Sequence, residues 1–508
     1  MCKTLNFFSE AQVFADFVPK SHFFFNFAII IKPYKHKVMD RKEFLKRMGL
    51  LMAGAVAINL DAKANTMMAL SEGEIPAIAS DKKIATKVKS LDAGLEKPVT
   101  VMVIGAGSRG STYARYAEKF PRSMKVVAVA DLKPNRRSTM AKKHNIPKEN
   151  QFVDFNEALS KPKLADAVVI ATPDNLHYEP CMKALALGYD VLLEKPVAPT
   201  EKECRDILKQ AHKYNRIVAV CHVLRYAPYF VALKEVVDSG AIGDLVSIQH
   251  MEPIQYAHMA HSYVRGNWPN SKTTTPIILA KSCHDLDIMR WIIGKPCETI
   301  AAEGSLHLFK AENAPKGAPE RCTDGCPHEA ECPYSAIDIY ERRKRHLHVF
   351  DLPNRNDVAL IREKLKTTNY GKCVYKCNND QCDHYVAIMR FQDGITASFT
   401  MDAFTPWGGR RTRIMGTKGF IEGDMKTFTF YDFRTGHKSV WDQKVSEIAE
   451  YKGSGHGGGD HALVRDFLRA VSAHDEKILS STIDVSIESH VMGFMAEKSR
   501  KSMKKVKI

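Results

Sequence analysis

A glycine-rich turn between two apolar segments constrains the fold of this chain more than any other feature. The segment "PVTVMVIGAG" (98–107) has the apolar run of a short buried strand, and "STYARYAEKF" (111–120) has helical spacing. A further apolar segment, "KVVAVADL" (125–132), predicts a second strand that ends at Asp131. Strand, glycine turn, helix, strand and acid follow one another in the order of a βαβ unit with a parallel sheet.

Each glycine of the turn has a separate physical role. Gly105 permits the tight turn, Gly107 lets the backbone approach a pyrophosphate, and Gly110 allows the helix to pack closely on the strand. The helix N-terminus stabilises the anion. Asp131 would accept hydrogen bonds from the adenosine ribose and repel a 2′-phosphate, which favours NAD over NADP. Arg136 and Arg137, which follow Asp131, keep NADP open as an alternative.

The strand, loop, helix and strand predicted over residues 165–198 support a dinucleotide site. The apolar segments "AVVIAT" (167–172) and "DVLLEK" (190–195) predict parallel strands buried on both faces. Loops at the carboxyl ends of such strands face the ligand crevice. The predicted cofactor contacts are therefore Gly105, Gly107, Ser108, Arg109, Gly110, Asp131, Thr172, Pro173, Asn175, His177, Glu194 and Lys195.

With Glu194-Lys195-Pro196 added to these segments, the chain resembles the glucose–fructose oxidoreductase/inositol dehydrogenase (Gfo/Idh/MocA) family over about residues 97–505. The motifs that carry this resemblance are "IGAGSRG", "ATPDNLHYEPCMKALALGYDVLLEKPVA", "HVLRYAPYFVALKEVVDSGAIGDL", "KSCHDLDIMRWIIG" and "RIMGTKGFIEGD". The resemblance implies an α/β protein with an NAD-binding Rossmann domain (97–221). A substrate and oligomerisation domain with an open, mostly antiparallel sheet (222–508) follows. The resemblance also implies a homo-oligomer that assembles through that sheet.

The resemblance assigns the catalytic residues. It places Glu194 by the nicotinamide ribose and Lys195 at the reacting hydroxyl or carbonyl, where a cation stabilises a developing alkoxide. It places the acid/base histidine at His284, whose ordinary pKa suits proton transfer near neutrality. Many members carry an aspartate four residues before this histidine, but this chain has Ala280 there. Lys281 and Asp287 are the candidates to replace the missing polar partner.

Other polar and aromatic residues are predicted to face the substrate. Arg225 and Tyr226 follow the segment "RIVAVCHV", and Arg225 either contacts substrate or braces its loop. In "HSYVRGNWP" (261–269), Arg265 and Trp268 suit a sugar ring, although a structural tryptophan is equally compatible. The glycine-rich segment "GSGHGGGDHALVRDFLRAV" (453–471) contributes His456, which is alternatively an exposed residue of a flexible loop.

Six of the twelve cysteines gather in two short tracts of an insertion around residues 305–385. "RCTDGCPHEAECPY" holds Cys322, Cys326 and Cys332, and "KCVYKCNNDQCDH" begins with Cys373. These four cysteines are candidate ligands of a structural metal such as zinc. Disulfides, which suit an oxidising compartment, and free thiols are the alternatives.

Residues 1–64 predict an export signal. "MDRKEFLKRMGLLMAGAVAINLDAKA" (39–64) has a basic start, a short apolar run and a small-residue cleavage site at Ala62-Lys63-Ala64. "RKEFLK" (41–46) resembles a degenerate twin-arginine signal, which predicts a periplasmic protein. The first 38 residues are predicted to be a mis-called extension before Met39, or else part of a longer leader. Residues 65–96 are predicted to be a linker, and no later segment has the length of a membrane span.

The formal net charge is +16, but the lysines and arginines are scattered and no nucleic-acid motif accompanies them. The sequence therefore predicts an NAD(P)-dependent oxidoreductase that acts on CH–OH groups of a sugar or glycoside and holds its cofactor tightly. One alternative is an NAD-dependent glycoside hydrolase that works by oxidation, elimination, hydration and reduction. A second alternative is a non-catalytic sugar sensor.

Overall fold

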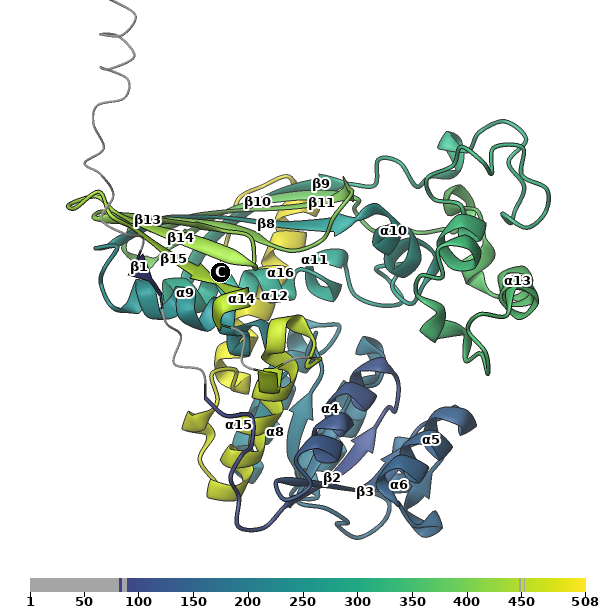
Figure 1. Cartoon of the computed structure of the whole chain (residues 1–508), viewed down its shortest axis with the longest axis horizontal. Helices are drawn as coiled ribbons and strands as arrows, with labels where there is room; N and C mark the ends of the chain where they lie inside the picture. Colours follow the sequence, from purple (N-terminus) through teal and green to yellow (C-terminus); the bar gives the residue numbers. More distant parts are fainter. Residues whose placement is uncertain (1–81, 85–88, 447–448, 452) are drawn as a thin grey trace, which may run out of the picture. The chain divides into compact units, whose positions relative to one another are not determined.

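The computed structural model describes residues 82–84, 89–446, 449–451 and 453–508 (Figure 1). The predicted export signal (1–64) and most of the predicted linker (65–96) lie outside these residues. Of the linker, Lys82–Lys83 form strand β1, which pairs in parallel with β15. No helix in the described part of the chain is long and apolar enough to cross a membrane.

The first sheet has six parallel strands in the order β4-β3-β2-β5-β6-β7. Its central strands are short apolar runs that are buried on both faces, as the sequence predicts. The strands are β2 (Val99–Ile104), β3 (Met124–Ala130), β4 (Gln151–Phe152), β5 (Ala167–Ile170), β6 (Asp190–Leu193) and β7 (Val218–Val220). The helices between them are α4 (Ser108–Lys119), α5 (Pro134–His144), α6 (Phe155–Leu159), α7 (Tyr178–Ala186) and α8 (Glu201–Tyr214).

The second sheet has ten strands in the order β1-β15-β14-β13-β12-β8-β11-β10-β9-β16. All neighbours in it are antiparallel except β1 with β15 and β8 with β11. Its remaining strands are β8 (Leu245–Gln255), β9 (Cys297–Ser305), β10 (His384–Phe391), β11 (Thr396–Thr405), β12 (Arg411–Gly416), β13 (Gly419–Gly423), β14 (Thr427–Asp432), β15 (Lys438–Asp442) and β16 (Val506–Lys507). The predicted fold class, a Rossmann domain followed by a mostly antiparallel α/β domain, is confirmed.

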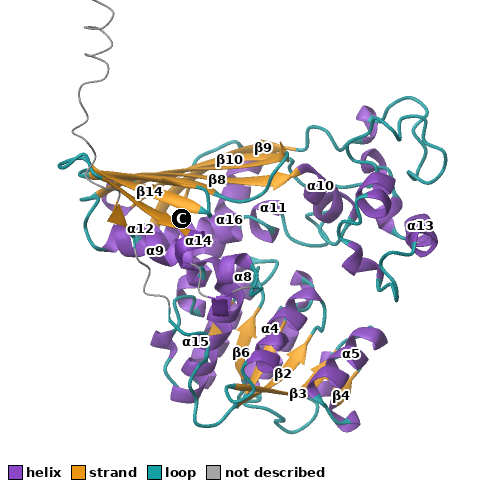
Figure 2. Ribbon diagram, in the orientation of Figure 1, coloured by secondary structure: helices purple, strands orange, loops and turns teal. Residues whose placement is uncertain are grey.

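Helices cover one face of this second sheet (Figure 2). They are α9 (Pro228–Asp238), α12 (Cys283–Ile293) and α16 (Ile483–Ser502), and their buried side chains join one core with those of β8 to β14. Short helices α10 (Tyr256–Met259), α11 (Ile277–Ala280) and α14 (Gln443–Ser446) lie between the longer elements. The opposite face of the sheet carries exposed apolar side chains, among them Met251, Val386 and Ile388.

The end of the chain returns to the first domain. Side chains of α15 (Gly459–Ala473), including Leu463, Phe467 and Leu468, are buried in the same core as β2 and α4. Ile483 and Ile487 of α16 pack with β5, β6 and α8 on the other face of the six-stranded sheet. The nucleotide-binding domain is therefore completed by residues that follow β15 of the second sheet in sequence.

The insertion at residues 305–385, hereafter the lobe, contains short helices and irregular segments (Figure 2). Its longest helix is α13 (Val358–Thr367), and a π-helical turn, η6 (Ile337–Arg342), precedes it. A second π-helical turn, η4 (Ala260–Arg265), follows α10 and contacts the lobe, where Arg265 donates to the carbonyl oxygen of Lys372. The lobe has its own buried aromatic residues, Tyr340 and Phe350, which pack edge-to-face.

Candidate active site

The glycine turn has the close approaches that its sequence predicts. Gly105 has a φ of +90°, and a Cβ on it would lie 2.6 Å from the carbonyl oxygen of Ala171. A Cβ on Gly110 would lie 2.0 Å from the carbonyl oxygen of Gly105. Helix α4 begins after Gly107 with no side-chain cap and no acidic residue in its first turn. Its first N–H groups are thus available to an anion.

Asp131 reaches the turn from the end of β3. Its Oδ2 accepts a hydrogen bond from the Ala106 amide at 2.7 Å, and its Oδ1 accepts one from the Lys133 amide at 2.7 Å. The two nearby cations are turned toward the lobe, because Lys133 Nζ lies 3.3 Å and Arg136 Nε 3.8 Å from Asp351. The carboxylate therefore stands beside the turn, where the adenosine ribose of a dinucleotide would lie.

A cavity of about 1080 Å³ opens over the turn. Its size is slightly above the usual range for small-molecule sites, about 300–1,000 Å³. Gly107, Ser108, Arg109, Thr172 and Pro173 line it from the Rossmann domain, and Trp268 lines it from the second domain. The backbone of the turn, the free N-terminus of α4 and Asp131 fit the pyrophosphate and ribose of NAD.

Two other predicted cofactor contacts, His177 and Asn175, lie in the loop after β5. The His177 ring lies between two carbonyl oxygens, with Nδ1 2.8 Å from that of Pro196 and Nε2 2.9 Å from that of Thr172. It thereby joins the loops after β5 and β6. Asn175 lies beside it in the turn η2 (Asp174–Leu176).

An ion-pair network joins the glycine-turn helix to two distant segments. Arg109 contacts Glu194 Oε1 at 2.6 Å and Asp460 Oδ1 at 2.8 Å. Tyr113 donates to the same Glu194 oxygen at 2.5 Å. Burial alone would raise the pKa of Glu194, but Arg109 and then Lys195 lower it below its ordinary value. Glu194 is therefore a carboxylate. Arg109, predicted as a cofactor contact, also holds this carboxylate in place.

The two predicted catalytic side chains, Lys195 and His284, come from different domains and lie near each other. Lys195 follows β6, and its Nζ donates to the carbonyl oxygen of Ala280 at 2.9 Å. His284 is the second residue of α12; its side chain is buried, and its Nδ1 has no hydrogen-bond partner. Burial, followed by the charge of Lys195, holds the pKa of His284 well below its ordinary value. The imidazole is thus neutral at pH 7 and able to accept a proton.

The two candidate replacements for the missing aspartate are engaged elsewhere. Lys281 pairs with Glu252 at 3.0 Å. Asp287 forms a bidentate pair with Arg225, at 2.7 Å to Nε and 2.6 Å to Nη2. The structure instead places two histidine rings with centroids 6.0 Å from that of His284, one of them His222 and the other His456. The Nδ1 of His456 is hydrogen-bonded to Asp460 at 2.9 Å.

Three predicted substrate residues are buried braces. Arg225 donates to Asp287 and to the backbone oxygen of Ser480. Of the two roles predicted for Arg225, it therefore has the one of bracing its loop. Tyr226 accepts from the backbone amides of residues 480 and 481 at 3.2 Å each. Arg265 donates to the carbonyl oxygens of Lys372 and Tyr334 at 2.7 Å each. Trp268, in contrast, stands in the wall of the large cavity.

Four histidines that were not predicted from the sequence line the cavity. Two of them belong to α10 and η4, and two belong to the lobe. The four are His258, His261, His346 and His348. The rings of His261 and His346 stack with centroids 4.1 Å apart. Burial is the first cause that lowers their pKa values, to about 3 for His258, about 2 for His261 and about 4 for His346. The three-residue and two-residue spacings in "HMAH" and "HLH" are the only sequence signal for them.

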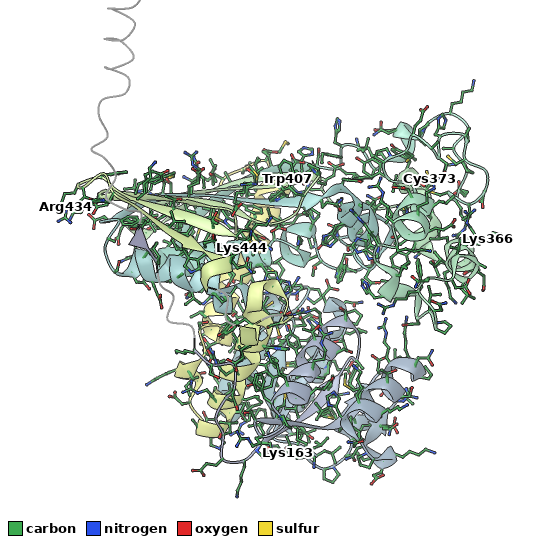
Figure 3. All side chains as sticks on the ribbon, in the orientation of Figure 1. Lys163, Lys366, Cys373, Trp407, Arg434 and Lys444 are labelled. Atoms are coloured by element: carbon green, nitrogen blue, oxygen red, sulfur yellow. The ribbon has the colours of Figure 1, made fainter. Side chains whose placement is uncertain are left out.

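The lobe cysteines form no disulfide in the described structure. Within the described residues, no group of three or more His, Cys, Asp or Glu side chains is placed to hold a single metal ion. Cys322, Cys326, Cys332 and Cys373 nevertheless line one cavity of about 230 Å³ (Cys373 is labelled in Figure 3).

The Rossmann domain, its anion-ready turn and the lysine–histidine pair define an oxidoreductase that binds a nicotinamide dinucleotide. Residues 99–222 match the Gfo/Idh/MocA family's NAD-binding Rossmann domain, and residues 234–508 match its C-terminal α/β domain. The chain belongs to this oxidoreductase family.

Relatives of several kinds share parts of the chain. The putative oxidoreductase YteT of Bacillus subtilis is 26% identical over 69% of this chain and 83% of its own length. An inositol 2-dehydrogenase of Acidothermus cellulolyticus is 30% identical over 42% of this chain and 60% of its own length. A levoglucosan dehydrogenase, solved with NADH and levoglucosan, has the same fold with a TM-score of 0.60 and 17% identity. That alignment covers 81% of this chain and all of the other chain.

Proposed function

We propose that this protein is an NAD-dependent dehydrogenase that transfers hydride between a secondary hydroxyl of a sugar or cyclic polyol and the nicotinamide ring. The observation that carries the proposal is the meeting of Lys195 with the buried, neutral His284. Lys195 is also close enough to His258, which lines the cavity over the glycine turn, to lower the pKa of that histidine. Substrates named for the relatives, inositol and levoglucosan, are polyhydroxylated rings.

The proposed chemistry divides between the two residues. NAD, when bound, supplies the hydride acceptor. In the oxidation direction, His284 removes the hydroxyl proton, and the C–H hydrogen leaves with its electron pair as hydride. The Lys195 ammonium stabilises the alkoxide that develops on the same oxygen. A base that is neutral at pH 7 contributes about 10²–10⁴-fold to such a step.

NAD is proposed over NADP because of the charges near Asp131. Its carboxylate would repel a 2′-phosphate. Of the nearby cations, Lys133 and Arg136 are paired to Asp351 of the lobe, and Arg137 donates to the carbonyl oxygen of Asp131 at 2.6 Å. Asp351 and other residues of the lobe line the same cavity as the glycine turn. We therefore also propose that the lobe holds the cofactor tightly and that turnover recycles it in place.

Export through the twin-arginine-like signal fits a tightly held cofactor, because that route carries folded cargo. Comparing the size and location of the chain with an Arg41→Lys/Lys42→Gln variant in cell fractions tests this part. Processing that is independent of these two residues would contradict the twin-arginine route.

One observation favours a second candidate, the NAD-dependent glycoside hydrolase. His456 stands 6.0 Å from His284, between ring centroids, and is oriented by Asp460. After oxidation of a ring carbon, a second base is needed to remove the acidified neighbouring proton, so that the anomeric group is eliminated. Water then adds, and the hydride returns to the ring carbon.

The test is a spectroscopic screen of the chain that begins after Ala64, without added NAD. Its near-ultraviolet absorbance is followed while a panel of sugars, glycosides and inositols is added. A lasting rise from reduced nicotinamide supports the dehydrogenase. Free sugar without a lasting rise supports the hydrolase. If bound NAD is confirmed and every sugar binds without either signal, the sensor replaces both.

A further inference from the structure

Arg265 is a buried cation without a carboxylate partner in the described structure. It ends η4, has a relative exposure of 2%, and its Nη1 has no hydrogen-bond partner. Its other nitrogens donate to the carbonyl oxygens of Lys372 and Tyr334. Carbonyl oxygens carry no net charge, so these bonds leave the guanidinium uncompensated. A buried charge is costly unless an opposite charge accompanies it.

The surroundings of Arg265 are rich in sulfur. The guanidinium lines the small lobe cavity together with Cys322, Cys326, Cys332 and Cys373. Cys322 Sγ accepts from Arg265 Nη2 at 3.7 Å and from the Ala336 amide at 3.4 Å. Both N–H groups are thus directed at the same sulfur.

The carboxylates of this cavity wall do not supply the missing charge. Glu329 accepts from Ser335 and is paired with Arg342. Glu331 is exposed. A metal centre held by the cysteines of this wall would deprotonate them and supply the missing negative charge.

The arrangement of the four cysteines selects among the groups that thiolates bind. They form no disulfide, and they are not placed to converge on a single ion. They surround a cavity of about 230 Å³, whereas one water molecule takes about 30 Å³. A core of several bridged atoms fits such a space. Four cysteine thiolates around an iron–sulfide core form a common centre of this kind, tuned by hydrogen bonds to its sulfurs.

We propose that Cys322, Cys326, Cys332 and Cys373 hold an iron–sulfur cluster, with Arg265 as its buried counter-cation. The cluster joins the two cysteine tracts of the lobe and is structural. It lies behind the wall of the cofactor cavity. In η4, His261 and Ser262 line the cofactor cavity and Arg265 lines the cysteine cavity.

Metal and sulfide analysis of the full chain, purified without oxygen, tests the proposal directly. We expect about four iron atoms and four acid-labile sulfides per chain, with visible charge-transfer absorption. Zinc without sulfide would overturn the cluster, and so would a metal-free protein whose cysteines all react as thiols or form disulfides. This measurement needs no variant and is independent of the dehydrogenase proposal.

Two serine variants locate the ligands. Cys332→Ser should lose most of the iron and sulfide. Cys377→Ser is the matched control: this cysteine belongs to the same lobe, but it does not line the cavity and its thiol bonds the backbone oxygen of Cys373. Iron retained by Cys332→Ser at the wild-type level, or lost equally in both variants, would refute the assignment.

Discussion

At the scale of single residues, burial and the surrounding cations set the protonation state of His284. Lys195, Arg410 and two further histidines act on it in the same direction as burial, and together they hold its ring neutral. A proton taken from a substrate hydroxyl would place a positive charge in this cationic setting. We therefore expect His284 to release that proton readily once the oxidised product has left.

Replacing His284 by asparagine should lower kcat by about 10²–10⁴-fold, because the proton acceptor is lost while the size of the side chain is nearly kept. His474→Asn is the matched control, since His474 is exposed at the end of α15 in a left-handed conformation that asparagine tolerates. Steady-state kinetics with a substrate from the screen measure both. An equal loss in the two variants, or no loss in either, would contradict the assigned role.

Gly110→Ala should abolish measurable NAD binding and destabilise the protein, because the new Cβ would lie 2.0 Å from the backbone oxygen of Gly105. Gly408→Ala is the control, since its Cβ would meet only the Pro253 carbonyl oxygen at an ordinary 3.7 Å. Calorimetric titration with NAD and thermal unfolding report the two effects. Wild-type affinity in Gly110→Ala would mean that the turn does not carry the dinucleotide.

At the scale of elements, α12 is tied to the turn η3 (Val223–Tyr226) by the buried pair of Asp287 and Arg225. Burial alone would raise the pKa of Asp287, but Arg225 and then His222 lower it, so the pair is ionised. This pair fixes the helix that carries His284 against the segment leaving the six-stranded sheet. The positioning of the proton acceptor thus depends on a contact outside the cavity.

Arg225→Met should lower the free energy of unfolding by about 3–5 kcal/mol, because it leaves the Asp287 carboxylate buried and unpaired. Lys202→Met removes one partner of an exposed i,i+4 pair and should leave the free energy of unfolding nearly unchanged. Urea unfolding of both variants gives the comparison. A large rise in KM for Arg225→Met with unchanged stability would instead assign Arg225 to the substrate.

The elements that could be predicted from sequence are those with a local signal. The strand before Gly105 and the acid at Asp131 follow from an apolar run and a spacing, and the family motif identifies Lys195 and His284. The bracing roles of Arg225 and Arg265 depend on Asp287 and Tyr334, which are distant in sequence. The four cavity histidines lie in two segments that only the folded lobe brings together. Sequence periodicity carries no information about such contacts.

At the scale of the whole molecule, stability should depend on pH through its buried histidines. The pKa values of His258, His261 and His346 are lowered mainly by burial, to about 3, 2 and 4. Below about pH 6.5 the unfolded chain binds protons that the native protein does not. The free energy of unfolding should therefore fall as the pH decreases from 7.5 to 5, by up to about 1.4 kcal/mol per pH unit for each such histidine.

Urea unfolding at several pH values measures this slope. His346→Asn should reduce this slope by up to the contribution of one proton, because one buried ring is removed. Asparagine tolerates the φ of +58° found at this position. A slope of zero in the wild-type protein, or an unchanged slope in the variant, would contradict neutral burial of these rings.

The open face of the ten-stranded sheet should join copies of the chain. Val386 and Met251 lie in one cross-strand row through Thr400, and Ile388 in the next row has a relative exposure of 65%. Ile388→Glu should shift the protein toward monomer in light scattering. Val358→Glu, at an exposed apolar position of the lobe, should not. A wild-type monomer at micromolar concentration would refute this assembly.

The return of α15 and α16 to the first domain has a consequence for biosynthesis. Both faces of the six-stranded sheet are sealed by side chains beyond residue 460, among them Leu463, Phe467 and Ile487. A ribosome has released the whole glycine turn long before it makes these residues. The nucleotide-binding domain therefore cannot finish its core until α15 and α16 have been synthesised, and stable capture of the dinucleotide must wait for these two helices.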